Sequence, residues 1–120
     1  KVGKTVWLKN ESQIDKATAV SGSGPGYIFT LIHSFEKAAK KLGFSKKQAR
    51  DLIMSTILGS ISLIKETKKE PQELAKQIAV KGGTTEAGIN NLKNNKIDKI
   101  ILTTFKSAYE RAKILGKKNQ

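Results

Sequence analysis

The stretch LIMSTILGSISLI, residues 52–64, decides the fold of this chain of 120 residues. It carries no charge between Asp51 and Lys65, and its large apolar residues recur at helical spacing along one face. Two leucines form a second apolar patch roughly opposite, and the remaining positions are serine, threonine or glycine. A helix that is apolar or small on every side is typical of one that is buried on every side.

The chain is too short to cover this helix easily on every side. A chain of this length buries roughly two thirds of its unfolded surface, which leaves little to surround one helix completely. A second copy of the chain is the simplest source of cover, and a central position in a monomeric bundle is the alternative. Ser45 and Gln48 have the spacing of a capping box, so we expect this helix to run from Ser45 to about Thr67.

The rest of the chain is also predicted to be helical, because its apolar residues recur at i, i+3, i+4 and i+7. The predicted helices span residues 27–42, 45–67, a short segment from Pro71, residues 86–93 and residues 97–116. Residues 2–8 are the one candidate strand. The sequence therefore predicts an all-α bundle of five to six helices in one domain, residues 1–120, with residues 1–10 as a linker or the remnant of a preceding domain.

Composition limits the classes of function. Without cysteine and with one histidine, the chain has no disulfide, thiolate metal site or histidine cluster, so we expect no metal and a cytoplasmic location. We find no signal peptide, and residues 52–64 are too short to cross a bilayer. Because the first residue is lysine, we expect a longer parent chain.

The charge is strongly basic. The net charge of +13 comes from 23 Lys and Arg against 10 Asp and Glu, which suggests nucleic acid as a partner. Only Arg50 and Arg111 are arginine, however, and the lysines are spread along the whole chain. A solvated lysine-rich surface is therefore the competing interpretation, and nucleic-acid binding is kept as the alternative function.

The first of two glycine clusters comprises Ser21, Gly22, Ser23, Gly24 and Pro25. It is not a Rossmann fingerprint, because Tyr27 stands where the third glycine belongs and no strand is predicted before it. It is not a Walker loop either, since G-K-[ST] is absent. The cluster is instead typical of a helix start, with Ser23 as N-cap, Pro25 in the first turn and the glycines forming a tight bend.

The second glycine cluster is Lys81-Gly82-Gly83-Thr84-Thr85-Glu86. It places free N–H groups and two hydroxyls at the start of a predicted helix, which is a favourable place for an anion. An ordinary capped helix is the alternative.

Three segments together resemble the C-terminal domain of pyrroline-5-carboxylate reductase. They are DKATAVSGSGPGYIF (residues 15–29), LGFSKKQARDLIMSTILG (42–59) and PQELAKQIAVKGGTTEAGINNL (71–92), and the resemblance extends from about Gly3 to Gly116. It implies a helical domain like the C-terminal domain of 6-phosphogluconate dehydrogenase, intertwined with a second copy as a homodimer. Some members of the family assemble further into a ring of five dimers.

The resemblance also implies an activity for the full-length protein. The family reduces 1-pyrroline-5-carboxylate to L-proline with NADPH or NADH in proline biosynthesis, and an N-terminal Rossmann domain holds the nucleotide. No such domain is present in this sequence. We therefore expect this chain alone to be inactive and to contain no cofactor-binding residues.

Site residues follow from the same resemblance. It implies that the backbone N–H groups of Gly83, Thr84 and Thr85 bind the substrate carboxylate, and that Thr85 is catalytic, with its hydroxyl near the imine nitrogen. Ile78 and Val80 belong to the implied substrate pocket, and residues 21–25 form the implied active-site turn.

The sequence departs from the family at several positions. Val80 and Lys81 replace the usual Ser-Pro, which removes a hydroxyl and a rigid residue, although Lys81 could supply a cation for the carboxylate. Ser55-Thr56 stands where Gln-Thr is usual. His33, the one histidine, lies beside an apolar stripe and is predicted to be structural or on the surface.

Overall fold

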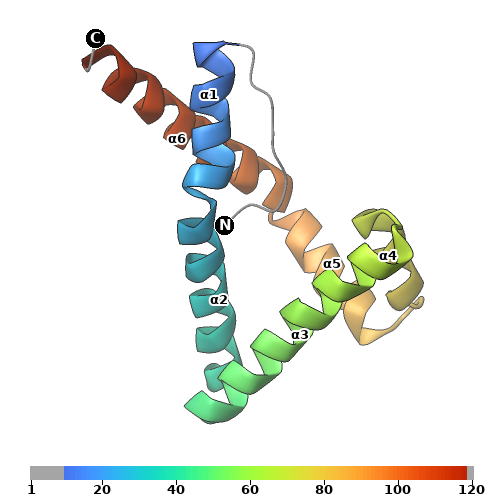
Figure 1. Ribbon diagram of the computed structural model, residues 1–120. Helices are drawn as coiled ribbons and strands as arrows, with labels where there is room; N and C mark the ends of the chain where they lie inside the picture. The colour runs from blue at the N-terminus through green and yellow to red at the C-terminus, as the bar shows by residue number, and fades with distance from the viewer. Residues whose placement is uncertain (1–9, 119–120) are drawn as a thin grey trace. The chain divides into compact units, whose positions relative to one another are not determined.

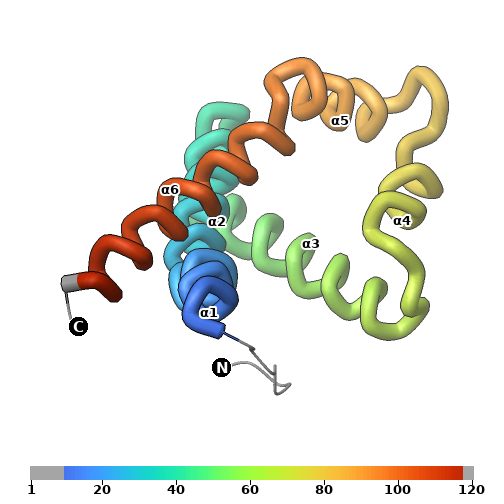
Figure 2. The backbone as a smooth tube through the Cα atoms, turned by 90° about the horizontal axis from the view of Figure 1, so that it is seen from above, coloured from blue at the N-terminus to red at the C-terminus, as the bar shows by residue number. Residues whose placement is uncertain are grey.

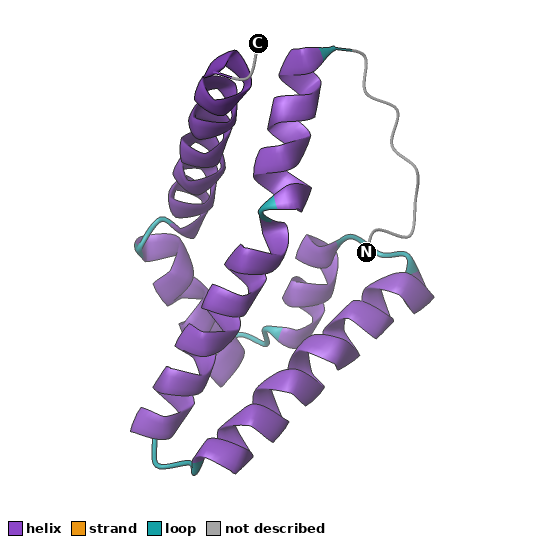
Figure 3. Cartoon of the chain, turned by 60° about the vertical axis from the view of Figure 1, so that its left-hand side comes forward, coloured by secondary structure: helices purple, strands orange, loops and turns teal. Residues whose placement is uncertain are grey.

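The structure, a computed structural model, describes residues 10–118, and this part of the chain is helical with no strand (Figures 1 and 3). Its elements are α1 (Glu11–Ala17), the π-helical turn η1 (Thr18–Gly22), α2 (Gly24–Lys41), α3 (Lys46–Thr67), α4 (Pro71–Ile78), α5 (Thr84–Asn94) and α6 (Ile97–Lys118). The predicted all-α class and helix number are confirmed. The candidate strand at residues 2–8 lies outside the described residues.

The described residues divide into two compact units, one holding residues 10–28 together with residues 96–118, the other residues 29–95. In the first unit α6 packs against α1 and η1, and the tube in Figure 2 shows α6 passing alongside α1. The ring of Tyr27 stacks on Phe105 with centroids 5.7 Å apart. The hydroxyls of Ser12 and Tyr109 lie 3.0 Å apart. Small apolar and aromatic contacts therefore hold this unit together, around the buried Ala19.

The first glycine cluster differs from its prediction. Pro25 does lie in the first turn of α2, as predicted. Ser23, however, has right-handed helical angles (φ −86°, ψ −12°), and its N–H donates to the Thr18 carbonyl over 2.8 Å. The backbone thus passes from α1 to α2 through a π-helical turn, and Ser23, the predicted N-cap, precedes α2 without the extended angles typical of that position.

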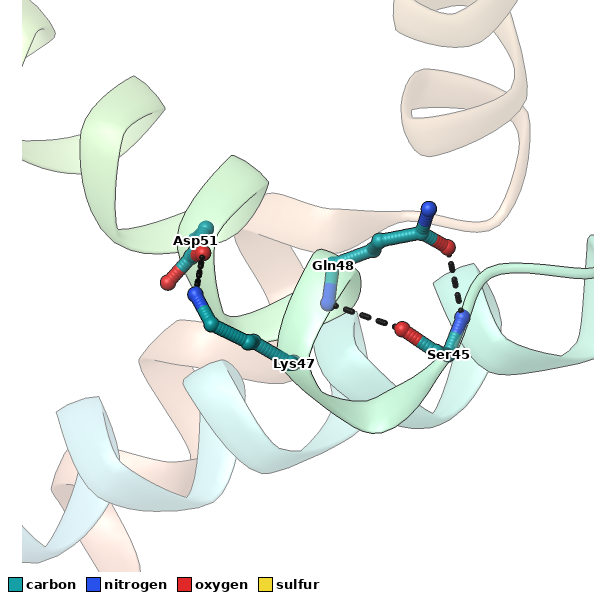
Figure 4. Close-up of polar contacts among 4 residues, drawn as sticks. All are labelled: Ser45, Lys47, Gln48 and Asp51. Carbon is teal, nitrogen blue, oxygen red and sulfur yellow. Dashed lines mark hydrogen bonds and ion pairs between the residues drawn. The ribbon is translucent and has the colours of Figure 1, made fainter.

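In the second unit, the predicted boundaries of α3 are confirmed. The Ser45 hydroxyl accepts from the Gln48 N–H over 3.1 Å, and the Gln48 side chain accepts from the Ser45 N–H over 2.9 Å, so the capping box is complete (Figure 4). The exposed pair of Lys47 and Asp51 lies one turn further along the same helix (Figure 4). Gly43, with φ +109°, ends the preceding helix as expected of a C-cap.

One ion pair ties α3 to α2. The Arg50 guanidinium donates to both carboxylate oxygens of Glu36, in a two-point contact across 14 residues of sequence. The Glu36 side chain is only 15% exposed, whereas that of Arg50 is 58% exposed. This pair links α2 and α3 within the second unit.

The apolar side chains of α3 are not covered within one chain. Leu58 is 59% exposed, and Leu52, Ile61 and Leu63 are 41–49% exposed. Among the described residues the buried apolar set is confined to Ala19, Ala49 and Leu74. None of residues 52–64 is buried in the structure, so the burial predicted for this helix is not seen in a single copy.

None of the helices within residues 10–118 combines the length and apolarity needed to cross a membrane. The same residues contain no group of three or more His, Asp or Glu side chains arranged to hold a metal ion.

Candidate functional site

The loop between α4 and α5 contains a tight turn. The Gly83 N–H donates to the Val80 carbonyl over 3.0 Å, which closes a four-residue turn. Gly82, the third residue, has φ +78°, whereas Lys81 is not among the residues with positive φ. This is the pattern of a type II turn, which needs a glycine at its third position.

Gly83 follows the turn as the N-cap of α5, with an extended backbone (φ −88°, ψ 177°). It needs no left-handed conformation, but it has no room for a side chain, because an added Cβ would clash with Val80. The two adjacent glycines are therefore required for different reasons, Gly82 by its backbone angle and Gly83 by its close neighbour.

The donors at the start of α5 are fewer than the sequence suggested. Gly83 was predicted to offer its N–H to an anion, but that group is already used within the turn. Among the hydrogen bonds of the described residues, none uses the N–H of Thr84 or Thr85. These two N–H groups lie in the first turn of the helix, where the macrodipole favours negative charge.

Glu86 takes part in the same loop, and sequence reasoning missed its role. Its carboxylate accepts a hydrogen bond from the Gly82 N–H over 2.9 Å. The signal was its place at the third position of α5, where a glutamate commonly reaches back to the backbone before the helix.

An apolar groove of about 330 Å³ begins beside these donors. Thr85 and Ile78 both line it, so the structure brings together two of the predicted site residues. Its other lining residues come from α3, α4 and α5, namely Ser60, Leu63, Ile64, Pro71, Leu74, Ala75 and Ile89. Val80 does not line the groove and is 65% exposed.

The predicted active-site turn, residues 21–25, lies in the other unit. The Ser21 hydroxyl donates to the Ala17 carbonyl over 3.0 Å, so it is used within the helix. A Cβ on Gly24 would meet nothing within 4 Å, so the surface there is open to an approaching group. His33 is exposed on α2, in agreement with a surface role.

The described residues do not form a dinucleotide site. Such sites are built on a strand–helix–strand unit with a glycine-rich first turn. Residues 10–118 contain no strand, and the glycine cluster at 21–25 runs through helical turns instead. Residues 10–118 therefore lack the strand–helix–strand unit on which dinucleotide sites of this kind are built.

Comparison with known proteins gives one family. The family model described as "Pyrroline-5-carboxylate reductase dimerisation" matches residues 11–115, across both compact units. Pyrroline-5-carboxylate reductase 2 of Bacillus subtilis is 36% identical over 105 residues, which are 88% of this chain and 38% of that protein. The reductase of Pseudomonas aeruginosa is 38% identical over 111 residues, or 92% of this chain and 41% of that protein.

Solved structures agree with these relatives. A pyrroline-5-carboxylate reductase from Coxiella burnetii superposes with a TM-score of 0.86 and 35% identity, covering 92% of this chain and 41% of that one. The pyrroline carboxylate reductase of Plasmodium falciparum, solved with NADP bound, superposes with a TM-score of 0.85 and 32% identity, covering 90% and 41%. This chain thus spans about two fifths of the length of these relatives, and it belongs to the family of pyrroline-5-carboxylate reductase dimerisation domains.

Proposed function

We propose that this chain is the dimerisation and substrate-binding part of a reductase that converts 1-pyrroline-5-carboxylate to L-proline with NADPH or NADH. The observation that carries the proposal is the pair of N–H groups of Thr84 and Thr85. These groups have no acceptor among the described residues and lie beside an apolar groove lined by Thr85. A small cyclic imine that carries a carboxylate requires this combination of an anion anchor and an apolar slot.

The substrate carboxylate accepts hydrogen bonds from Thr84 and Thr85 at the positive end of the α5 dipole. Lys81 is exposed two residues before the helix N-cap and takes part in none of the ion pairs among the described residues, so its ammonium adds attraction for the anion. The pyrroline ring lies toward the groove, and the Thr85 hydroxyl lies near the ring nitrogen, which gains a proton as the ring is reduced.

A nicotinamide nucleotide would supply the hydride, as in other enzymes of this chemistry. In support, the Plasmodium falciparum relative was solved with NADP bound. Since the described residues contain no dinucleotide fold, the role proposed for this chain is to bind and orient the substrate, and the nucleotide is assigned to a separate domain. We therefore expect no reduction by this chain alone.

A homodimer is the second part of the proposal. Its support is the family match together with the exposed apolar side chains of α3, which a second copy would bury. Assembly into a ring of five dimers and a cytoplasmic location stay predictions. Nucleic acid is not proposed as a partner, because the relatives named above are all described as reductases and nothing in the comparisons supports nucleic-acid binding.

The test joins this chain to the dinucleotide-binding domain of the Bacillus subtilis relative and measures the oxidation of NADPH and NADH with 1-pyrroline-5-carboxylate. We expect turnover by the joined protein and none by the chain alone. A joined protein that is helical and dimeric yet shows no turnover would contradict the proposed activity.

A further inference from the structure

The turn of residues 80–83 has an unusual second residue. Proline is favoured at the second position of a type II turn, because its ring fixes φ near the required value. Lys81 occupies that position here and leaves the backbone freer. Among the described backbone hydrogen bonds, the one from the Gly83 N–H to the Val80 carbonyl closes the turn, and the Val80 N–H donates outside it to the Ile78 carbonyl.

Glu86 supplies a second tie. Its carboxylate accepts from the Gly82 N–H over 2.9 Å, so the left-handed residue of the turn is fastened to the first turn of α5. A hydrogen bond to a charged acceptor is stronger than one between neutral groups. The hydrogen bond that closes the turn uses the N–H of Gly83, so it leaves the N–H of Gly82 without a partner inside the turn.

The position of the turn decides which groups a ligand meets. Gly83 joins the turn to α5, and the N–H groups of Thr84 and Thr85 follow directly. If the turn loosens, Lys81 and Gly82 are free to cover the start of the helix or to draw the first turn out of shape.

We propose that Glu86 is a positioning residue, whose hydrogen bond to Gly82 holds the 80–83 turn so that the Thr84 and Thr85 N–H groups stay open to the substrate carboxylate. This rests on the proposed function for the identity of the ligand. Glu86 does not itself touch the substrate, and its negative charge disfavours an anion nearby. The hydrogen bond from Gly82 to Glu86 should therefore raise the affinity for an anion, whereas the negative charge of Glu86 should lower it. Because the two effects have opposite signs, variants can distinguish them.

The test uses the 120-residue chain, NMR measurement of amide exchange at Gly82 and Gly83, and titration with L-proline. In Glu86→Ala both amides should exchange about tenfold faster, the change expected for loss of one hydrogen bond, and L-proline should bind about tenfold more weakly. Glu86→Gln keeps an acceptor oxygen and loses the charge. It should keep slow exchange at both glycines and bind L-proline at least as tightly as the unaltered chain.

A rescue experiment distinguishes the positioning role of Glu86 from a general loss of stability. Lys81→Pro stiffens the turn independently, and no hydrogen bond of the described residues uses the Lys81 N–H that it would remove. In Lys81→Pro/Glu86→Ala the Gly83 amide should again exchange slowly and the Gly82 amide should not. The double variant should bind L-proline at least as tightly as Lys81→Pro alone, because the turn is held and the negative charge is gone; the comparison with Lys81→Pro controls for the lost ammonium.

Unchanged exchange at Gly83 in Glu86→Ala would overturn the proposal, and so would equal weakening of L-proline binding by Glu86→Ala and Glu86→Gln. Tighter binding in both variants would also overturn it, because charge alone would then explain the effect. If L-proline bound to none of the proteins, the proposed function would fail, while exchange at the two glycines would still decide the role of Glu86.

Discussion

A Cβ atom added to Gly83 would lie 2.8 Å from Cγ2 of Val80 and 3.1 Å from the Val80 carbonyl oxygen. The side-chain methyl could rotate away, but the carbonyl cannot, because it accepts the hydrogen bond that closes the turn. A side chain at Gly83 must therefore displace the backbone.

The first prediction compares the two glycines. Gly83→Asn should destabilise the protein by about 1–3 kcal/mol through overpacking and weaken L-proline binding. Gly82→Asn should be tolerated, because asparagine adopts left-handed angles at small cost and a Cβ there meets nothing within 4 Å. Urea unfolding at a fixed protein concentration measures the free energy of unfolding of both variants. Equal losses in the two variants would contradict the steric explanation.

The second prediction concerns Glu36, whose pKa is lowered chiefly by its hydrogen bond to Arg50 and further by the charge of that guanidinium. A carboxyl group with a lowered folded-state pKa adds stability above its unfolded value near 4.5, and this stability is lost as pH falls through the folded value. Glu36→Gln should therefore lower Tm at neutral pH, and the difference from the unaltered chain should shrink below pH 4.5.

Asp51→Asn is the matched control. It removes the exposed pair of Lys47 and Asp51, whose side chains are 86% and 62% exposed, and pairs of this kind contribute little to stability. A Tm difference for Glu36→Gln that stayed constant through the acid range would mean that the ion pair is not its cause.

The third prediction tests the dimer through Leu58, which is 59% exposed in one chain. In a monomer, Leu58→Lys would change a surface position, with an effect within about 0.5 kcal/mol. In a homodimer that covers α3 it would bury an unpaired charge, at a cost on the order of 3–5 kcal/mol. Light scattering should therefore find the unaltered chain as a dimer and Leu58→Lys dissociated or unfolded.

Glu66→Lys adds the same side chain near the end of the same helix, where the position is exposed and polar, and should remain dimeric. A monomeric unaltered chain with a cooperative thermal transition would contradict the proposed homodimer. So would a Leu58→Lys variant that dimerises with unchanged affinity.

The helices could be predicted where a local signal begins or ends them. The capping box of Ser45 and the first-turn Pro71 both act within a few residues, so sequence spacing is sufficient. The backbone at the start of α2 could not be predicted in this way. A serine before glycine and proline is typical of an extended N-cap, but Ser23 has helical angles, and the π-helical turn before it packs against α6. Tertiary contacts there override the local preference.

The geometry of the proposed site could be predicted in part for a similar reason. The helix start proposed to bind the carboxylate is formed by residues that follow one another in the sequence. The use of the Gly83 N–H within the turn and the reach of Glu86 to Gly82 depend on backbone angles, which spacing does not determine. The exposure of residues 52–64 depends on how many copies associate, so a single sequence indicates only that cover is needed.

The last prediction concerns Thr85, in the chain joined to a dinucleotide-binding domain. Its hydroxyl can be removed while its backbone N–H stays, and it is the one threonine of its pair that lines the groove. Thr85→Val, which keeps the shape, and Thr85→Ala should both lower kcat/KM about tenfold to a hundredfold, or roughly 1.4–2.8 kcal/mol, because one hydrogen bond near a charged nitrogen is lost. Thr85→Ser, which keeps the hydroxyl, should retain most of the activity, and Thr84→Ala, at an exposed position outside the groove, should change kcat/KM little. Steady-state kinetics at saturating nucleotide measure these values, with light scattering to establish that the dimer persists. If Thr85→Val matched the unaltered protein while Thr85→Ser lost activity, the methyl group and not the hydroxyl would matter, and the assignment of Thr85 to the imine nitrogen would fail.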